Sequence, residues 1–118
     1  MTRNEQIVVD LKQLVENHIN DRSFNVTKLC ICTKMSRVSM YRKTMQLYNC
    51  GPKEYLENIR LEVAKNKIDS DDCCIKVVAF EVGFRDPKYF ARKFKQKYLI
   101  TPTVYKKQNY PVEKYIKI

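Results

Sequence analysis

Hydrophobic residues recur every three or four positions along most of this chain, which is the spacing of one face of an α-helix. The first such series consists of Ile7, Val8, Leu11, Leu14, Val15, His18 and Ile19. It predicts an amphipathic helix over residues 4–20. A second series consists of Tyr55, Leu56, Ile59 and Val63. It predicts a longer helix over residues 52–68. The sequence shows no sustained alternation of apolar and polar residues, the pattern typical of a half-buried strand.

Capping residues and prolines predict where five more helices begin and end. The predicted ranges are 26–33, 37–48, 73–82, 87–98 and a short helix from 102. The residues that mark helix starts are Asn25, Ser36, Pro52, Asp72, Asp86 and the pair Thr101-Pro102. Asn49 and Gly83 can take the left-handed conformation that ends a helix. The sequence therefore predicts an all-α fold with seven helices.

The segment RKTMQLYNCGPKEY (42–55) is repeated fifty residues later as RKFKQKYLITPTVY (92–105). Each copy begins inside a basic predicted helix, and a short helix and a tight turn come before it. This order is the layout of the helix-turn-helix motif, whose second helix enters the major groove of DNA. The sequence thus predicts two helix-turn-helix subdomains, 1–50 and 70–118, joined by a long linker helix over 51–69.

Positive charge is concentrated in the two segments that contain the repeat. The 118 residues carry a formal net charge of +10. Residues 34–53 contain five basic residues and no acid, and residues 85–107 contain eight basic residues and one acid, so the rest of the chain carries −2. Charged helix faces are usually solvated surface. The coincidence with the repeat instead favours a role in binding DNA phosphates.

Residues suited to metal binding or catalysis are few. The one histidine, His18, lies in the first apolar series. The five cysteines are Cys30, Cys32, Cys50, Cys73 and Cys74. Their odd number and their spacing do not match a zinc site or a disulfide framework, and no hydrolase triad can be assembled. We therefore expect no enzymatic activity, no metal and no cofactor.

Membrane and secretion signals are also missing from the sequence. No stretch approaches the roughly 18 uninterrupted apolar residues that a membrane helix requires. The N-terminal residues form an amphipathic series with acidic positions, which is unlike a secretory signal. We therefore expect a cytoplasmic location and no membrane contact by this segment.

Three stretches together resemble the DNA-binding domain of the AraC family of bacterial transcription regulators. They are MSRVSMYRKTMQLYN, RLEVAKNKI and VVAFEVGFRDPKYFARKFKQKYLITPTVY. The most specific part is GFRDPKYFARKFK followed by TP and a tyrosine, and the likeness extends over about residues 7–107. The variant SRVSMYRK is most similar to output domains of hybrid two-component regulators. The resemblance implies one DNA-binding domain whose two helix-turn-helix units occupy successive major-groove segments on one face of the duplex.

The resemblance also implies which residues face the bases. In the third predicted helix they are Arg37, Val38, Tyr41 and Arg42. The matching positions of the sixth helix hold Pro87, Lys88, Ala91 and Arg92. Because arginine can donate two hydrogen bonds to guanine, we expect Arg42 and Arg92 to make direct base contacts. The alternative for each is a phosphate contact or an ion pair with a carboxylate such as Glu81.

The remaining basic residues have a simpler expected role, which is to neutralise phosphates and set the register. They are Lys34, Lys43, Lys53, Lys93, Lys95 and Lys106. A further set is apolar at helical spacing and is expected in the core. It consists of Met40, Leu47, Phe84, Phe90 and Phe94.

Two positions depart from the family pattern, because the sequence has Asn49 and Leu99 where the family usually has glycine. Asparagine tolerates a positive φ, whereas leucine would be strained there. We therefore expect the end of the sixth helix to differ from the family. The two units also present different side chains, so we expect the first to carry more base specificity and the second more of the backbone contacts.

Double-stranded DNA is the predicted partner, and two alternatives remain. A basic helical domain could instead bind RNA, or it could serve as a protein-interaction module. We also expect a sensor or receiver domain in the full-length protein, and RNA polymerase is a further candidate partner.

Overall fold

The computed structural model describes residues 3–70 and 73–109, which form seven α-helices. They are α1 (Arg3–Asn17), α2 (Val26–Thr33), α3 (Arg37–Tyr48), α4 (Pro52–Ser70), α5 (Ile75–Glu81), α6 (Pro87–Tyr98) and α7 (Pro102–Asn109). The predicted all-α fold with seven helices is confirmed.

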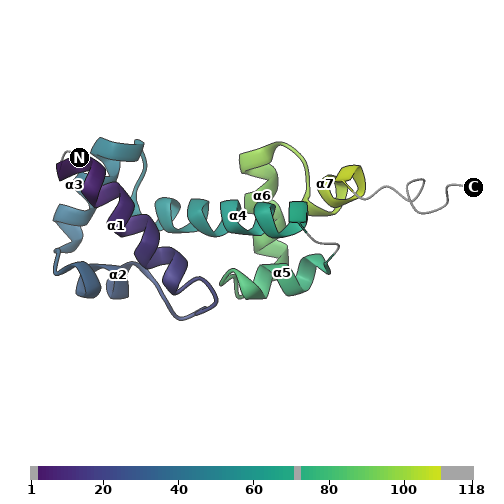
Figure 1. The fold of residues 1–118 in the computed structure, drawn as a ribbon, viewed down its shortest axis with the longest axis horizontal. Coiled ribbons are helices and arrows are strands. Elements are labelled where there is room, and N and C mark those ends of the chain that lie inside the picture. The colour runs from purple at the N-terminus through teal and green to yellow at the C-terminus, as the bar shows by residue number, and fades with distance from the viewer. Residues whose placement is uncertain (1–2, 71–72, 110–118) are drawn as a thin grey trace, which may run out of the picture.

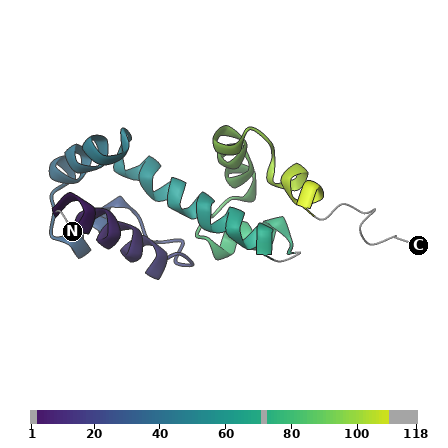
Figure 2. The same cartoon turned by 45° about the horizontal axis from the view of Figure 1, so that its top comes forward.

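The helices form two groups at the two ends of α4. In Figure 1, α1, α2 and α3 surround the N-terminal half of α4, and α5, α6 and α7 surround its C-terminal half. Figure 2 shows the same separation from a second direction. The molecule is elongated, with dimensions of 58 × 30 × 23 Å. We call α1–α3 the first unit and α5–α7 the second unit.

Each unit has its own hydrophobic core, and α4 contributes to both. Tyr55, Leu56 and Ile59 of α4 belong to the first core. Leu61, Ala64 and Ile68 of α4 belong to the second. The residues predicted to be buried were Met40, Leu47, Phe84, Phe90 and Phe94. All are confirmed as buried except Leu47, which is half-buried.

The N-caps of the two basic helices are confirmed. The Ser36 side chain accepts a hydrogen bond from the Ser39 N–H at 3.1 Å, and the Asp86 carboxylate accepts one from the Lys88 N–H at 2.9 Å. These bonds satisfy backbone donors that have no partner within a helix. The sequence therefore determined where α3 and α6 begin.

Three of the predicted helices have different bounds in the structure. The first helix ends at Asn17 instead of Asn20, because the chain folds back and the His18 ring stacks on Phe24 at 4.5 Å. α4 continues to Ser70. The fifth helix begins at Ile75, and its N-cap Cys74 makes no side-chain capping bond. The predicted cap Asp72 lies outside the described residues.

The turns that precede α3 and α6 have the same hydrogen-bond pattern. The Met35 N–H donates to the Cys30 carbonyl at 3.0 Å, and the Phe84 N–H donates to the Ala79 carbonyl at 2.9 Å. The residue before each donor has a positive φ, which is the usual way to end a helix in this motif.

The second turn is one residue longer than the first. In the first turn, Met35 alone separates the left-handed Lys34 from the N-cap of α3. In the second, both Phe84 and Arg85 separate the left-handed Gly83 from the N-cap of α6. Arg85 is therefore an extra residue with no counterpart in the first unit.

The C-terminal ends of α3 and α6 are alike, contrary to expectation. Asn49 ends α3 with φ 57°, and Leu99 ends α6 with φ 71°. The Leu99 N–H donates to the Lys95 carbonyl at 2.8 Å, and its side chain is 82% exposed. The expectation that this end would depart from the glycine-like conformation is wrong. Because the side chain meets solvent rather than the core, only the backbone strain opposes this arrangement.

Two charged residues on α4 connect the helix to both units. Glu57 is buried, and its carboxylate accepts a hydrogen bond from the Tyr89 hydroxyl and pairs with Lys93 at 3.6 Å, both on α6. Arg60 is also buried, and its guanidinium donates to the Phe24 carbonyl at 2.7 Å. The two bonding networks hold α6 and the loop between α1 and α2 against the same helix.

We predict that Leu99→Gly stabilises the domain by about 0.5–1 kcal/mol, because glycine removes the cost of a left-handed leucine while its own backbone entropy offsets part of the gain. Urea denaturation measures the change. Leu99→Ala is the matched control, since it removes the side chain and keeps the Cβ, and it should give no comparable gain. If the Leu99→Gly protein is no more stable than the Leu99→Ala protein, the inference that the left-handed backbone at residue 99 is strained is wrong.

We predict that Gly83→Ala lowers the free energy of unfolding by at least about 2 kcal/mol. A Cβ on Gly83 would lie 2.7 Å from both Arg60 Nε and the Ile19 carbonyl, at a φ of +98°. Gly51→Ala is the control, because a Cβ there meets only the Tyr41 ring, at 3.6 Å. Equal stability of the two variants would show that Gly83 is not required.

We predict that Tyr89→Phe lowers the free energy of unfolding at neutral pH by about 1–2 kcal/mol, since it removes a bond to a buried carboxylate. That bond raises the pKa of Tyr89 from its ordinary 10 to about 12. A raised folded pKa means that the stabilisation is complete below pH 10 and is lost as the pH rises through 12. The difference between wild type and variant should therefore shrink over this interval in urea denaturation. Tyr41→Phe, at an exposed site, is the control and should leave stability unchanged.

Candidate nucleic-acid interface

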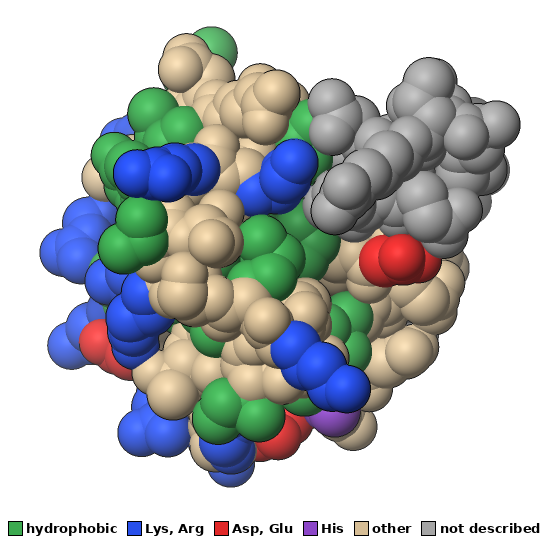
Figure 3. Space-filling view, turned by 90° about the vertical axis from the view of Figure 1, so that its left-hand side faces the viewer, with side chains coloured by type: hydrophobic (Ala, Val, Ile, Leu, Met, Phe, Trp, Pro, Cys, Tyr) green, Lys and Arg blue, Asp and Glu red, His purple; other side chains and the backbone are tan. Residues whose placement is uncertain are grey.

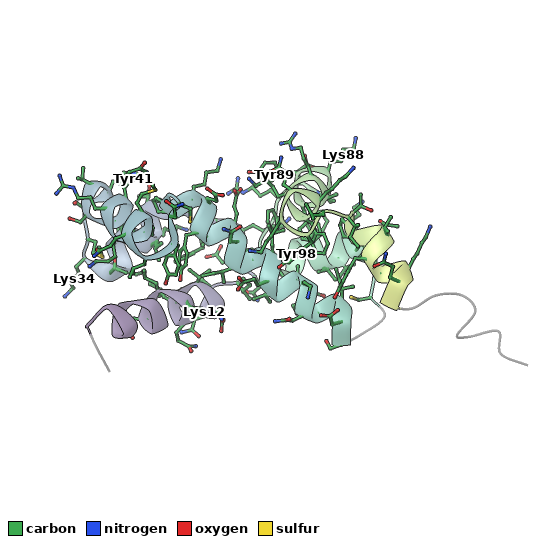
Figure 4. All side chains as sticks on the ribbon, turned by 90° about the horizontal axis from the view of Figure 1, so that it is seen from above. Lys12, Lys34, Tyr41, Lys88, Tyr89 and Tyr98 are labelled. Atoms are coloured by element: carbon green, nitrogen blue, oxygen red, sulfur yellow. The ribbon has the colours of Figure 1, made fainter. Side chains whose placement is uncertain are left out.

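The two basic helices present their side chains on the same side of the molecule. Figure 4 shows Tyr41 of α3 and Lys88 of α6 pointing to one side, whereas Lys12 of α1 points to the other. Figure 3 looks at the molecule from the end of the first unit and shows Lys and Arg side chains gathered along its left-hand side, which is the same side of the molecule. The structure therefore brings the two predicted reading helices to one basic face.

The four residues predicted to read bases from α3 lie together on its outward face. Arg37 and Arg42 are exposed, Val38 is 60% exposed and Tyr41 is 53% exposed. The opposite face of the helix holds the buried Met40. The Arg37 guanidinium donates to the Thr27 hydroxyl of α2, which orients it at the start of the helix.

The matching face of α6 carries the same number of exposed cations but less exposed apolar surface. Lys88 and Arg92 are exposed, whereas Pro87 and Ala91 are half-buried. The Arg92 guanidinium lies over the Tyr89 ring, 5.1 Å from its centre. Cation–π contact of this kind restrains the long side chain in an outward direction. The second unit thus offers two cations and little apolar surface.

The alternative of an ion pair with Glu81 is not observed for either arginine. Glu81 instead pairs with Lys67 at 3.3 Å. Within the described residues, neither Arg42 nor Arg92 lies within ion-pair distance of a carboxylate. Both guanidiniums are therefore available to bases or phosphates.

The predicted phosphate ligands differ in their surroundings. Lys34, Lys53 and Lys95 are exposed, while Lys43, Lys93 and Lys106 are half-buried. The charge of Lys93 is paired with the buried Glu57 at 3.6 Å. Its contact with a phosphate would compete with the network that holds α6 to α4.

Two buried charged residues that support the interface, Glu57 and Arg60, were not predicted from the sequence. Burial lowers the pKa of the Arg60 guanidinium, and the nearby Glu57 and Asp21 partly oppose that effect. The available signal was a pair of opposite charges one helical turn apart, beside the apolar series of α4. The apolar series of α4 predicted a buried helix face, but it did not indicate that charged residues also lie on that face.

The described part of the chain has neither a cluster of metal ligands nor a helix that could span a membrane. Residues 3–70 and 73–109 contain no group of three or more potential ligands that could hold a metal ion. None of the helices that the structure describes has the length and apolarity needed to cross a membrane. None of the five cysteines, all of which lie among the described residues, forms a disulfide bond.

The chain is similar over most of its length to curated proteins that include a histidine kinase and transcription regulators. It is 28% identical over 102 residues to histidine kinase P4 of Formosa agariphila, covering 86% of this chain and 7% of that protein. It is 27% identical over 103 residues to the raffinose operon regulator RafR of Pediococcus pentosaceus, covering 87% and 36%. The chain thus spans well under half the length of these relatives.

Solved structures share the fold. The C-terminal domain of the two-component response regulator YesN of Fusobacterium nucleatum is 26% identical with a TM-score of 0.75, covering 86% of this chain and 98% of that one. The DNA-binding domain of AdpA, solved in complex with a target DNA, is 23% identical with a TM-score of 0.75, covering 83% and 87%.

The family model that matches describes a helix-turn-helix domain and covers residues 29–108. The matched range includes both basic helices and the long helix between them. The chain therefore belongs to the AraC-type helix-turn-helix family of DNA-binding domains.

Proposed function

We propose that the domain reads a two-part site in duplex DNA, with α3 in one major-groove segment and α6 in the next. The observation that supports this most directly is the placement of the two capped, exposed helices on one face at the two ends of α4. A recognition helix contacts base edges through residues near its N-terminus, which is where the predicted reading residues of both helices lie.

The two reading helices have different roles in this proposal. Arg42 donates two hydrogen bonds to a guanine, while the exposed Val38 and Tyr41 contact thymine methyl groups. On α6, Arg92 is restrained by Tyr89 and reads one base. Because α6 exposes little apolar surface, the first unit supplies more base specificity and the second more backbone contact.

Phosphate contacts supply affinity and register in the proposal. The residues are Lys34, Lys43, Lys53, Lys93, Lys95 and Lys106. Each neutralised phosphate releases counterions, so binding weakens steeply as salt rises. RNA binding and a pure protein-interaction role are less well supported, because neither explains two matched, capped reading helices on one face.

We further propose that this domain is the output module of a longer cytoplasmic regulator. The domain would consist of residues 1–50, 51–69 and 70–118. This division is supported by α4, whose first part belongs to one hydrophobic core and whose second part belongs to the other.

A sensor or receiver domain would control this DNA-binding domain, and RNA polymerase is a candidate partner. The domain itself would catalyse no reaction. The lengths of the relatives and the response-regulator origin of a similar structure support this view.

Selection of bound sequences from random duplexes tests the reading roles. For Arg42→Ala and Arg92→Ala, we expect each variant to lose preference at one patch, with the patches about 34 Å apart, one helical turn. Each lost contact should cost about 1–3 kcal/mol of discrimination. Lys12→Ala, on the opposite side of the molecule, is the control and should keep both patches.

Two results would contradict the assignment. Uniform weakening with unchanged preference would make both arginines phosphate ligands. Tighter binding of single-stranded RNA than of duplex DNA at matched salt would overturn the proposed function itself.

A further inference from the structure

A groove lies between the two units and is lined by residues from both. Its walls are the loop between α1 and α2, the start of α3, one face of α4 and the turn before α6. In Figure 1 the loop after α1 comes close to the turn between α5 and α6, beneath α4. The volume is about 590 Å³, which is enough for a phosphodiester group. We call this feature the inter-unit groove.

The inter-unit groove is strongly basic. Its basic lining residues are Arg22, Arg37, Lys53, Arg60 and Arg85, and its acidic ones are Glu57 and Asp86. Both acids are already engaged: Asp86 caps α6, and Glu57 is bonded to two α6 side chains. None of the five cations lies in an ion pair with another described residue. The groove therefore retains an excess of positive charge.

One of these cations is buried without full compensation. Arg60 is 8% exposed, and its Nε is a buried donor with no hydrogen-bond partner among the described residues. A charge held in a low-dielectric wall attracts an anion more strongly than the same charge in water. Arg60 thus adds to the positive electrostatic potential of the groove. The exposed Arg22, Arg37 and Arg85 line the same groove.

Two exposed arginines, one from each unit, meet at the groove. Arg85 Nε donates to the Arg22 carbonyl at 3.3 Å, and the Arg22 guanidinium lies over the Phe80 ring at 5.2 Å. Arg85 is the extra residue in the turn of the second unit. These contacts anchor both side chains, and both residues remain exposed.

The position of the groove determines which anion reaches it. Arg37 is the first residue of α3, and Asp86 is the N-cap of α6, so the groove separates the N-terminal ends of the two reading helices. When a duplex places successive major-groove segments on the two helices, the minor groove between those segments faces this gap. The phosphates on the edges of that minor groove therefore lie toward the inter-unit groove.

We propose that the inter-unit groove binds a DNA backbone phosphate midway between the two half-sites, with Arg22 and Arg85 as its direct ligands. Lys53 lies beside them at the start of α4 and adds charge to the same wall. The inference rests on the proposed function, because only a duplex held by both reading helices crosses the groove.

The test uses the duplex recovered by the selection above, with single phosphates replaced by neutral methylphosphonates. Wild-type protein should bind about tenfold more weakly when a central linkage between the patches is neutral. Arg85→Gln should be weakened on the normal duplex, and central neutral linkages should then have little further effect. Undiminished wild-type binding to every centrally substituted duplex would overturn the proposal.

Salt dependence provides an independent readout. The double variant Arg22→Gln/Arg85→Gln should reduce the slope of log affinity against log salt by about 0.9, the value for one phosphate, and each single variant should reduce it by part of that amount. Arg85→Lys should retain the slope. Lys12→Gln makes the same change of charge on the opposite side and should also retain it; equal slopes for Arg85→Gln and Lys12→Gln would argue against the site.

The outcomes separate the two proposals. If wild type binds the duplex through both patches but ignores central phosphates, the groove is not a phosphate site and the proposed function stands. If no duplex is bound, the proposed function fails. Thermal melting identifies variants that unfold, and the methylphosphonate series on wild type decides the question without any variant.

Discussion

The placement of both reading helices depends on the buried charges of α4. Glu57 bonds to α6, and Arg60, one turn further along, bonds to the backbone of the loop between α1 and α2. Burying a charge is costly unless partners satisfy it, so these contacts tolerate little change in geometry. Two apolar cores alone would allow the units to slide along α4, whereas directional bonds from one helix to both units fix their relative position.

The fold was largely predictable because its signals are local. Ser36 and Asp86 cap their helices through bonds to residues two or three positions away, and the apolar spacing identified the buried faces of α3 and α6. The left-handed conformation of Leu99 was not predicted, because the surrounding structure determines it against the local preference. Local preference disfavours a left-handed leucine, but the turn that leads into α7 imposes this conformation, and solvent exposure removes any packing penalty.

The candidate interface was predictable only in part. The repeat placed Arg42 and Arg92 on matching exposed faces, since equal spacing within a helix gives equal direction. It did not reveal the pairing of Lys93 with Glu57, or the position of Arg22 beside Arg85, because these contacts join segments far apart in sequence. Arg22 also lies outside both basic segments, so the distribution of charge along the sequence does not identify it.

The rigid connection has a consequence for recognition. Once one reading helix is in its groove, the other binds as an intramolecular step, with an effective concentration set by how well the fixed spacing matches the DNA. A flexible linker would allow binding to half-sites at many separations, with a modest gain in affinity at each. Because α4 is anchored to both units by buried charges, the proposed binding gains much affinity at one separation of the half-sites and little at others. A phosphate held in the inter-unit groove would sharpen that dependence, because a duplex with the wrong spacing would turn a different part of its backbone toward Arg22 and Arg85. Under the proposed reading of bases by α3 and α6, specificity therefore depends on the distance between the two base contacts as well as on the contacts themselves.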